Sequence, residues 1–359
     1  MTDALVLAQR HAARQRRIAV TAMAAALREW GLLDAADLRA SWSVVGPRLV
    51  AVLSAAQLTA AEGAGDYVDA TAAAQGAGPD ATGRVNATAF TGIAADGRAL
   101  DTLMLRPLVT TYRSIGQGST PAQALAAGRG LLATIVRSEV ADAGRQAVGV
   151  GIAARRTIQG YVRVVQPPAC GRCVILAGVE YGWNRGFQRH PRCDCIHLPT
   201  TLIARYQHRG GIRGDAFSPT TRMGSTARGF INPRAYFDSL DRAEQDRIFT
   251  SAGARAIREG ADMAQVVNAR RGMTTVTAYG RRVAATREGT TARGAFFRQE
   301  RARTEERTGT RFARNRAEVR RGLRRFELRT PRLMPEEIYR LAENRDEAIA
   351  MLRRFGYLT

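Results

Sequence analysis

Cysteine and histidine residues are concentrated in one short stretch near the middle of the chain. All four cysteines of the 359 residues fall in the segments Cys170-Gly-Arg-Cys173 and His190-Pro-Arg-Cys193-Asp-Cys195. Two cysteines separated by two residues are typical of a tight turn that directs both sulfur atoms at one metal ion. His190 and Cys193 repeat that spacing, and thiolate and imidazole ligands together are characteristic of tetrahedral Zn²⁺. The sequence therefore predicts one structural zinc ion per chain.

The candidate metal ligands outnumber the four that tetrahedral zinc needs. They are Cys170, Cys173, His190, Cys193 and Cys195. Either Cys193 or Cys195 is then spare, or His190 does not ligate. Two disulfides, or unligated or catalytic thiols, are the other uses of four cysteines. A catalytic zinc would also need an open coordination position and a general base, and the spacing of nearby acids singles out none.

The chain is strongly basic, and its charge is unevenly distributed. The formal net charge is +22 and the pI is about 11.3, with every basic residue an arginine. A lysine-free composition is expected from a GC-rich genome, but codon bias does not explain the charge excess. Residues 1–160 hold 16 arginines against 12 acids, whereas residues 281–330 hold 16 arginines against 6 glutamates. Such an excess predicts a polyanionic partner, with nucleic acid or an acidic protein surface ahead of a membrane.

The periodicity of apolar residues predicts a chain that is mainly α-helical. Helices are expected over residues 3–30, 35–74 with a break at Gly46-Pro47, 100–114 and about 121–154. Thr120 and Pro121 provide a start signal for the last of these. The pattern then changes: β-branched residues alternate over 161–165, and a short strand is expected over 196–198. Asn232-Pro233 starts a further helical region, and 333–340 and 346–355 complete a helical C-terminus.

These patterns predict a mainly α fold with a small zinc-stapled β module in the middle of the chain. Three domains are expected: a helical domain over 1–155, a Cys/His module over 156–205, and a basic helical and extended region over 206–359. In so small a module the metal would substitute for a hydrophobic core. Residues 209–229 are expected to form a linker, because they are rich in Gly, Ser, Thr and Arg.

The sequence gives no sign of a membrane partner or of secretion. No stretch approaches about 20 uninterrupted apolar residues, the length that a membrane-spanning helix needs. The N-terminus lacks the basic start and apolar run of a signal peptide. We therefore expect synthesis in a reducing cytosol, where thiols bind metal in preference to forming disulfides.

The Cys/His segment and its flanks resemble the MuF-type minor head proteins of tailed bacteriophages. The shared features are the strand at 161–165, Cys170-x-x-Cys173-x-x-Leu176-Ala-Gly178, Tyr181 and His190-Pro-x-Cys193-x-Cys195. Downstream blocks at 238–245, 261–273, 288–291 and 333–342 are similar to the versions found in phages of GC-rich actinobacteria. The resemblance covers residues 120–359, and the preceding residues add only a generic helical domain.

This resemblance implies a structural, head-morphogenesis role. Such a protein lies inside the procapsid near the portal and contacts the portal protein, the major capsid protein or both. Packaged double-stranded DNA is then the expected polyanion, bound without sequence preference, because arginine makes strong contacts with phosphate. The arginines expected to bind DNA are Arg298, Arg301, Arg303, Arg311, Arg314, Arg320, Arg321, Arg324 and Arg325.

Two enzymatic alternatives remain open at this point. Actinophage proteins of this layout are often described as capsid maturation proteases, for which His11, His197 and His208 are the available catalytic histidines. No Gly-x-Ser-x-Gly motif accompanies them, so the sequence favours a structural component. The third possibility is a zinc-stapled nuclease, in which His190 would act as a base instead of a ligand.

Overall fold

The computed structural model describes residues 2–184, 186, 191–201, 231–278, 280–292 and 294–358. His190, His208 and the expected linker at 209–229 lie outside these residues. The chain divides into two compact units. One comprises Met1–Pro168 and Leu176–Ile231, and the other comprises Ala169–Ile175 and Asn232–Thr359. The expected division into three domains at residues 155 and 205 stays a prediction.

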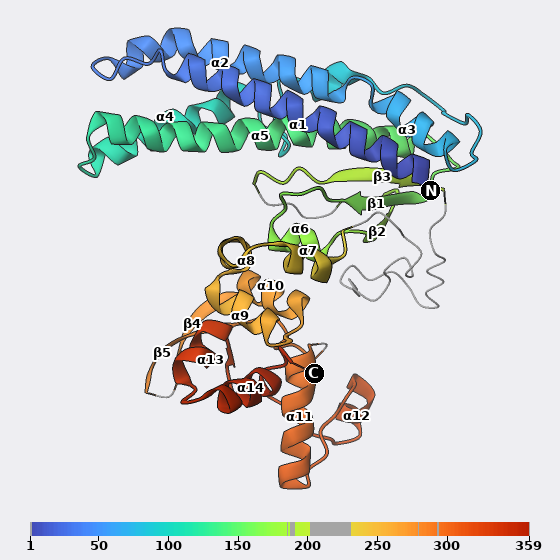
Figure 1. The fold of residues 1–359 in the computed structure, drawn as a ribbon, viewed down its shortest axis with the longest axis vertical. Helices are drawn as coiled ribbons and strands as arrows, with labels where there is room; N and C mark the ends of the chain where they lie inside the picture. The colour runs from blue at the N-terminus through green and yellow to red at the C-terminus, as the bar shows by residue number, and fades with distance from the viewer. Residues whose placement is uncertain are drawn as a thin grey trace. The chain divides into compact units, whose positions relative to one another are not determined.

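The N-terminal unit is a bundle of long helices (Figure 1). Its elements are α1 Thr2–Trp30, α2 Leu38–Ala61, α3 Ala64–Ala73, the 3-10 turn η1 Ala87–Phe90, α4 Leu100–Gly116 and α5 Pro121–Ala153. The expected start of α5 is confirmed: Thr120 caps the helix, and its hydroxyl and the Gln123 side chain form a reciprocal capping box. Trp30, Leu53, Met104 and Val136 lie in the core where α1, α2, α4 and α5 meet.

The break expected at Gly46-Pro47 is wrong. Pro47 lies inside α2, where it removes one helical hydrogen bond. Val45 and Leu49 on either side of it are buried in the main core, and that packing outweighs the missing bond. The helix is interrupted instead at Gly63, whose φ of +73° is a left-handed conformation that glycine adopts without strain.

The helical residues Leu38–Ala73 are long and apolar enough to cross a membrane, judged by length and composition alone. Core helices of soluble proteins can be equally long and apolar. In this structure Leu49, Leu53 and Val68 of this stretch are fully buried among the other helices.

A three-stranded antiparallel sheet follows the bundle, and both expected strands are confirmed. Its strands are β1 Gly160–Val164, β2 Glu180–Gly182 and β3 Ile196–Thr200, in the order β2-β1-β3. Tyr161, Val162 and Leu198 pack in one hydrophobic core with Val68 of α3 and Val148 of α5. The expectation that a metal would substitute for a core is therefore wrong, because the sheet shares the core of the helices.

The C-terminal unit is built from short elements (Figure 1). They are α6 Gly171–Ile175, α7 Pro233–Ser239, α8 Arg242–Phe249, α9 Ser251–Arg258, α10 Met263–Arg271, β4 Met273–Ala278, β5 Arg281–Thr286, α11 Ala295–Thr308, α12 Arg316–Arg320, β6 Arg332–Leu333, α13 Pro335–Leu341 and α14 Arg345–Arg354. Asn232 caps α7 through its side chain, as the Asn-Pro signal predicts. Phe237, Phe296, Leu333 and Phe355 are buried in its core.

The second sheet was not expected from the sequence. β4 and β5 form a hairpin, and β6 pairs with the last two residues of β5. The missed signal is the run Thr274-Thr275-Val276-Thr277, whose β-branched residues favour a strand. Gly280, with a φ of +71°, lies in the turn that closes the hairpin. The predicted fold class, mainly α with a small β-sheet in mid-chain, is confirmed.

Candidate metal centre

Three buried cysteines form a group that could hold a metal ion. The sulfur atoms of Cys173, Cys193 and Cys195 all lie within 4.8 Å of one another. Cys173 lies in α6, between β1 and β2 in the chain, and Cys193 and Cys195 immediately precede β3. The described residues contain no disulfide between the four cysteines. Soft thiolates in a tight, buried group suit a thiophilic ion such as Zn²⁺.

Cys170 and His190 are the remaining predicted ligands, and neither belongs to this group of three. Cys170 is outside the group of three and only half-buried, and its Sγ accepts a hydrogen bond from the Cys173 amide at 3.4 Å. That bond is typical of the turn at a Cys-x-x-Cys pair. His190 lies outside the described residues. The predicted roles of Cys170 and His190 as ligands therefore stay predictions.

A buried arginine on the central strand contacts two of the three thiols. Arg163 of β1 is only 1% exposed, and its Nη2 lies 3.4 Å from Cys195 Sγ and 3.7 Å from Cys193 Sγ. Three thiolates around a divalent ion keep a net negative charge, and a buried guanidinium offsets it. Arg163 was not among the residues expected from the sequence to belong to this site. Its signal was an arginine in the middle of the otherwise apolar strand Tyr161-Val-Arg-Val.

A second buried arginine holds the backbone of the Cys193–Cys195 turn. Arg145 of α5 donates through Nη1 to the carbonyl oxygens of Cys193, at 2.8 Å, and Cys195, at 2.9 Å. Between them, Asp194 forms an ion pair with Arg16 of α1 at 2.8 Å. The turn is thus fixed from two helices of the same unit. Such support from outside the ligand set orients ligands and raises metal affinity.

Aromatic rings surround His197 and His11 in the same unit. His197 of β3 stacks on Tyr161 at a centroid distance of 4.0 Å, and its carbonyl accepts a hydrogen bond from Tyr67 at 2.8 Å. Tyr67 in turn stacks on His11 of α1 at 3.9 Å. Burial, with Arg14 nearby, lowers the pKa of His11 to about 4, so this imidazole is neutral at pH 7.

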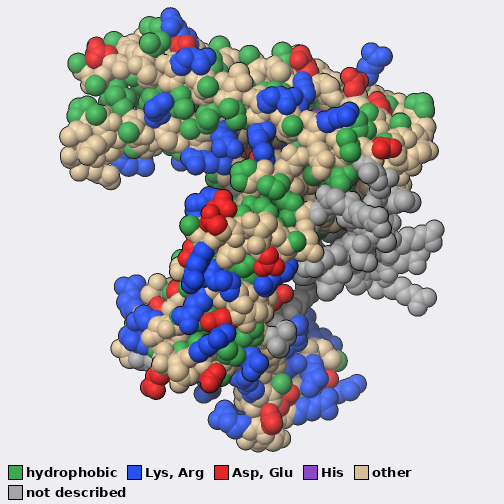
Figure 2. Space-filling view, in the orientation of Figure 1, with side chains coloured by type: hydrophobic (Ala, Val, Ile, Leu, Met, Phe, Trp, Pro, Cys, Tyr) green, Lys and Arg blue, Asp and Glu red, His purple; other side chains and the backbone are tan. Residues whose placement is uncertain are grey.

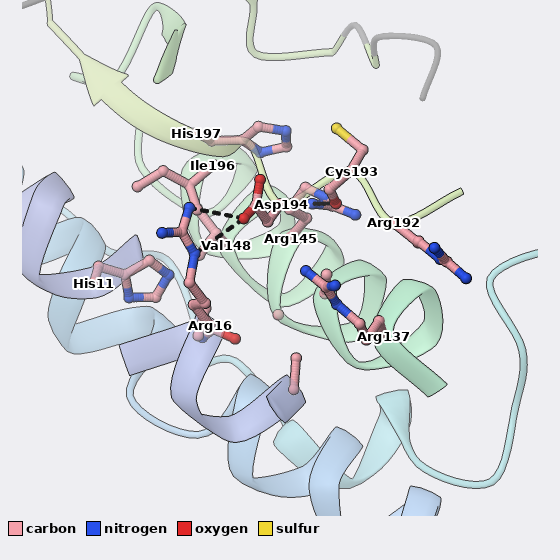
Figure 3. Close-up of a pocket in the computed structure, with 14 residues that line it drawn as sticks. His11, Arg16, Arg137, Arg145, Val148, Arg192, Cys193, Asp194, Ile196 and His197 are labelled. Atoms are coloured by element: carbon pink, nitrogen blue, oxygen red, sulfur yellow. Dashed lines mark hydrogen bonds and ion pairs between the residues drawn. The ribbon is translucent and has the colours of Figure 1, made fainter. Parts of the chain in front are cut away.

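A small pocket lies beside the Cys193–Cys195 turn (Figure 3). Arg16, Arg137, Arg145 and Arg192 line it together with Asp194, His11 and His197. Its internal volume is about 20 Å³, room for roughly one water molecule. Among the described residues the lining contains no serine, so the two histidines have no serine nucleophile beside them there.

The nine arginines predicted to bind DNA differ in how they are paired within the C-terminal unit. Arg303, Arg311 and Arg314 are ion-paired, with Glu300 at 3.5 Å, Glu318 at 3.6 Å and Glu305 at 3.6 Å respectively. Four others are exposed and form no ion pair within the described part of the chain: Arg320, Arg321, Arg324 and Arg325. Arg298 is exposed and Arg301 is half-buried, both on α11.

Comparison with known proteins identifies a family for this chain. A family model described as VG15 protein matches residues 2–211. This range contains the helical bundle, the first sheet and all four cysteines. No curated protein matches the chain, and no solved structure matches it.

Proposed function

The chain belongs to the VG15 protein family, a family of phage-encoded proteins, and from this we propose that it is a MuF-type structural minor head protein. In this proposal it is made in the bacterial cytoplasm and enters the procapsid. There it lies in the head interior near the portal vertex, in contact with the portal protein, the major capsid protein or both. It also contacts packaged double-stranded DNA.

The observation that most supports this proposal is the exposed, unpaired arginine cluster around α12. Arg320, Arg321, Arg324 and Arg325 lie within six consecutive residues, and no described carboxylate neutralises them. Figure 2 shows arginine side chains gathered over the C-terminal unit near α11 and α12. Guanidinium groups that are not engaged by carboxylates remain available for phosphate oxygens. A protein enclosed with dense DNA would use such groups without reading sequence.

Zinc is part of the same proposal, with a structural role. The ion would be held by Cys173, Cys193 and Cys195 and by one further ligand, with Arg163 offsetting the charge of the thiolates. We propose one such ion per chain.

The DNA-binding role is tested by two variants with the same change in net charge. In the first, Arg320, Arg321 and Arg324 are replaced by Gln. In the second, the ion-paired Arg303, Arg311 and Arg314 are replaced by Gln. Binding of the full chain to a random-sequence duplex is measured between about 50 and 200 mM salt, where counterion release dominates the affinity.

We expect wild-type affinity to fall steeply with salt and the first variant to flatten that dependence. The slope of log K against log salt should decrease by about 0.9 for each phosphate that the variant no longer neutralises. The second variant should change the slope less, because its arginines are already engaged by glutamates. Equal slopes in all three proteins, or no binding at low salt, would contradict a DNA role and favour an acidic protein partner.

A further inference from the structure

β4 is an edge strand in the part of the chain that the structure describes. It pairs only with β5, in antiparallel register from Met273↔Thr286 to Ala278↔Arg281. The Arg287 amide donates to the Gly272 carbonyl at 2.9 Å, so these two residues form a hydrogen-bonded pair of the ladder. This pair determines which residues of β4 bond to β5. Hydrogen-bonded residues alternate along an antiparallel strand. The backbone N–H and C=O groups of Met273, Thr275 and Thr277 therefore point away from β5.

Within the described strand Met273–Ala278, three features that usually block strand addition are absent. Exposed edges are normally protected by charged residues, proline or a bulge. β4 reads Met273-Thr-Thr-Val-Thr-Ala278, without charge or proline, and its register is continuous. Its β-branched residues favour pairing with a further strand. Three outward-facing residues are enough for one short, hydrogen-bonded segment.

A groove runs beside the same strand. It has a volume of about 440 Å³ and is lined by residues 274–277 of β4, by Thr286 and Thr290, and by the segment 328–332. Most of its polar lining consists of threonine hydroxyls and the guanidinium groups of Arg287 and Arg329. The side chains of an added strand that point to one face of the sheet would enter this groove.

The arginines around this edge favour an acidic partner. Arg281, Arg282, Arg287 and Arg329 are all exposed near β4, and Figure 2 shows arginines at this side of the unit. A second copy pairing edge to edge in antiparallel fashion would bring the Arg281 end of one strand against the basic Arg270 end of the other. Like charges opposed in this way are destabilising. An acidic segment would instead be attracted.

We propose that β4 is a docking edge at which an extended, acidic segment of a partner polypeptide adds as a fourth strand. The alternating outward N–H and C=O groups of β4 match the spacing of a polypeptide backbone, which favours a peptide over a nucleic acid. The arginines at the rim recognise its acidic side chains. This interaction is separate from the α12 arginines and does not depend on DNA binding.

The test uses a fluorescently labelled peptide of alternating Glu and Val, titrated with the full chain and followed by anisotropy. Thr275→Pro removes one outward N–H but no bond to β5, so the hairpin is retained. Thr275→Val is the matched control, because it keeps the N–H. Circular dichroism of each variant confirms that the fold is intact.

We expect Thr275→Pro to weaken peptide binding about tenfold, the effect of removing roughly one hydrogen bond and its alignment, and Thr275→Val to bind as the wild type does. A peptide with Lys in place of Glu, or with alternate amides N-methylated, should bind much more weakly. Equal binding of the proline variant, the lysine peptide or the N-methylated peptide would overturn the proposal. So would a DNA oligonucleotide whose binding, unlike that of the peptide, is abolished in Thr275→Pro.

Discussion

At the scale of single residues, the candidate centre depends on two buried arginines as well as on the thiols. Arg163 contacts the sulfurs of Cys193 and Cys195, and Arg145 holds their carbonyl oxygens. A buried arginine without such partners would be strongly destabilising. Both arginines lie in the range matched by the VG15 family model, as do the four cysteines. The two arginines and the cysteine turn are therefore linked by direct hydrogen bonds.

The first prediction at this scale concerns metal content. The chain purified under reducing conditions should contain about one zinc per molecule, because binding of the ion by thiolate ligands is coupled to folding. Each of Cys173→Ser, Cys193→Ser and Cys195→Ser should lower the bound metal well below that value in elemental analysis. Cys170→Ser and His190→Gln, measured in the same way, identify the fourth ligand. His11→Gln is a control outside the cysteine group.

A metal-free wild-type chain with an intact circular dichroism spectrum would contradict the zinc proposal. Because the first sheet shares its core with α3 and α5, the variants should lose metal without losing the sheet. A cysteine variant that loses both would show that the ion is required for the fold of the N-terminal unit.

The second prediction at this scale concerns pH and His11. Its pKa of about 4 in the folded chain is below the ordinary value of 6.5, so the unfolded chain binds the proton more readily between these values. Stability is thus present above pH 6.5 and is lost as pH falls toward 4. Between pH 7.5 and 5.5 the loss from this residue should be roughly 1 kcal/mol.

Urea unfolding followed by tryptophan fluorescence measures this effect. All three tryptophans, Trp30, Trp42 and Trp183, belong to the N-terminal unit, so their signal reports its unfolding. Between pH 7.5 and 5.5, the stability of His11→Gln should change less than that of the wild type, by roughly 1 kcal/mol. An identical pH dependence in both proteins would mean that burial and the nearby Arg14 do not keep His11 neutral.

At the scale of elements, helices and strands could be predicted from the sequence where local chemistry determines the structure. Thr120-Pro121 and Asn232-Pro233 start helices because side-chain caps satisfy their first amides. Gly46-Pro47 was a misleading signal, because burial of Val45 and Leu49 in the bundle keeps α2 continuous. The β4–β5 hairpin was missed because it borders the arginine-rich residues 281–330, a region that was expected to be helical and extended. Its pairing depends on β-branched residues on both sides of a turn.

The candidate site could be predicted only in part, for a related reason. Spacing identified the cysteines, since Cys-x-x-Cys is a local pattern. Neither Arg145 nor Arg163 could be assigned from spacing, because each reaches its partner from a different element: Arg145 lies 48 residues from Cys193, and Arg163 lies 32 residues from Cys195. The division of the arginines into paired and unpaired groups likewise depends on tertiary contacts such as Arg311 with Glu318.

At the scale of the whole molecule, the chemistry is divided between two units. The N-terminal unit holds the helical bundle and the first sheet, and the C-terminal unit holds the exposed arginines and the β4 edge. The VG15 family model ends at residue 211, so it does not cover the arginine-rich region. We propose that the part of the chain beyond the match provides the contacts with DNA and with an acidic partner.

The central claim is that this chain is a structural component of the phage head, and co-assembly tests it most directly. The chain is co-expressed with the portal, scaffold and major capsid proteins of its own phage, and particles are isolated by sedimentation and treated with external protease. We expect the chain to co-sediment in few copies, to be protected from the protease, and to leave the termini of the major capsid protein unprocessed. A chain that stays at the top of the gradient would contradict it, as would processed capsid termini that disappear with His11→Ala or His197→Ala.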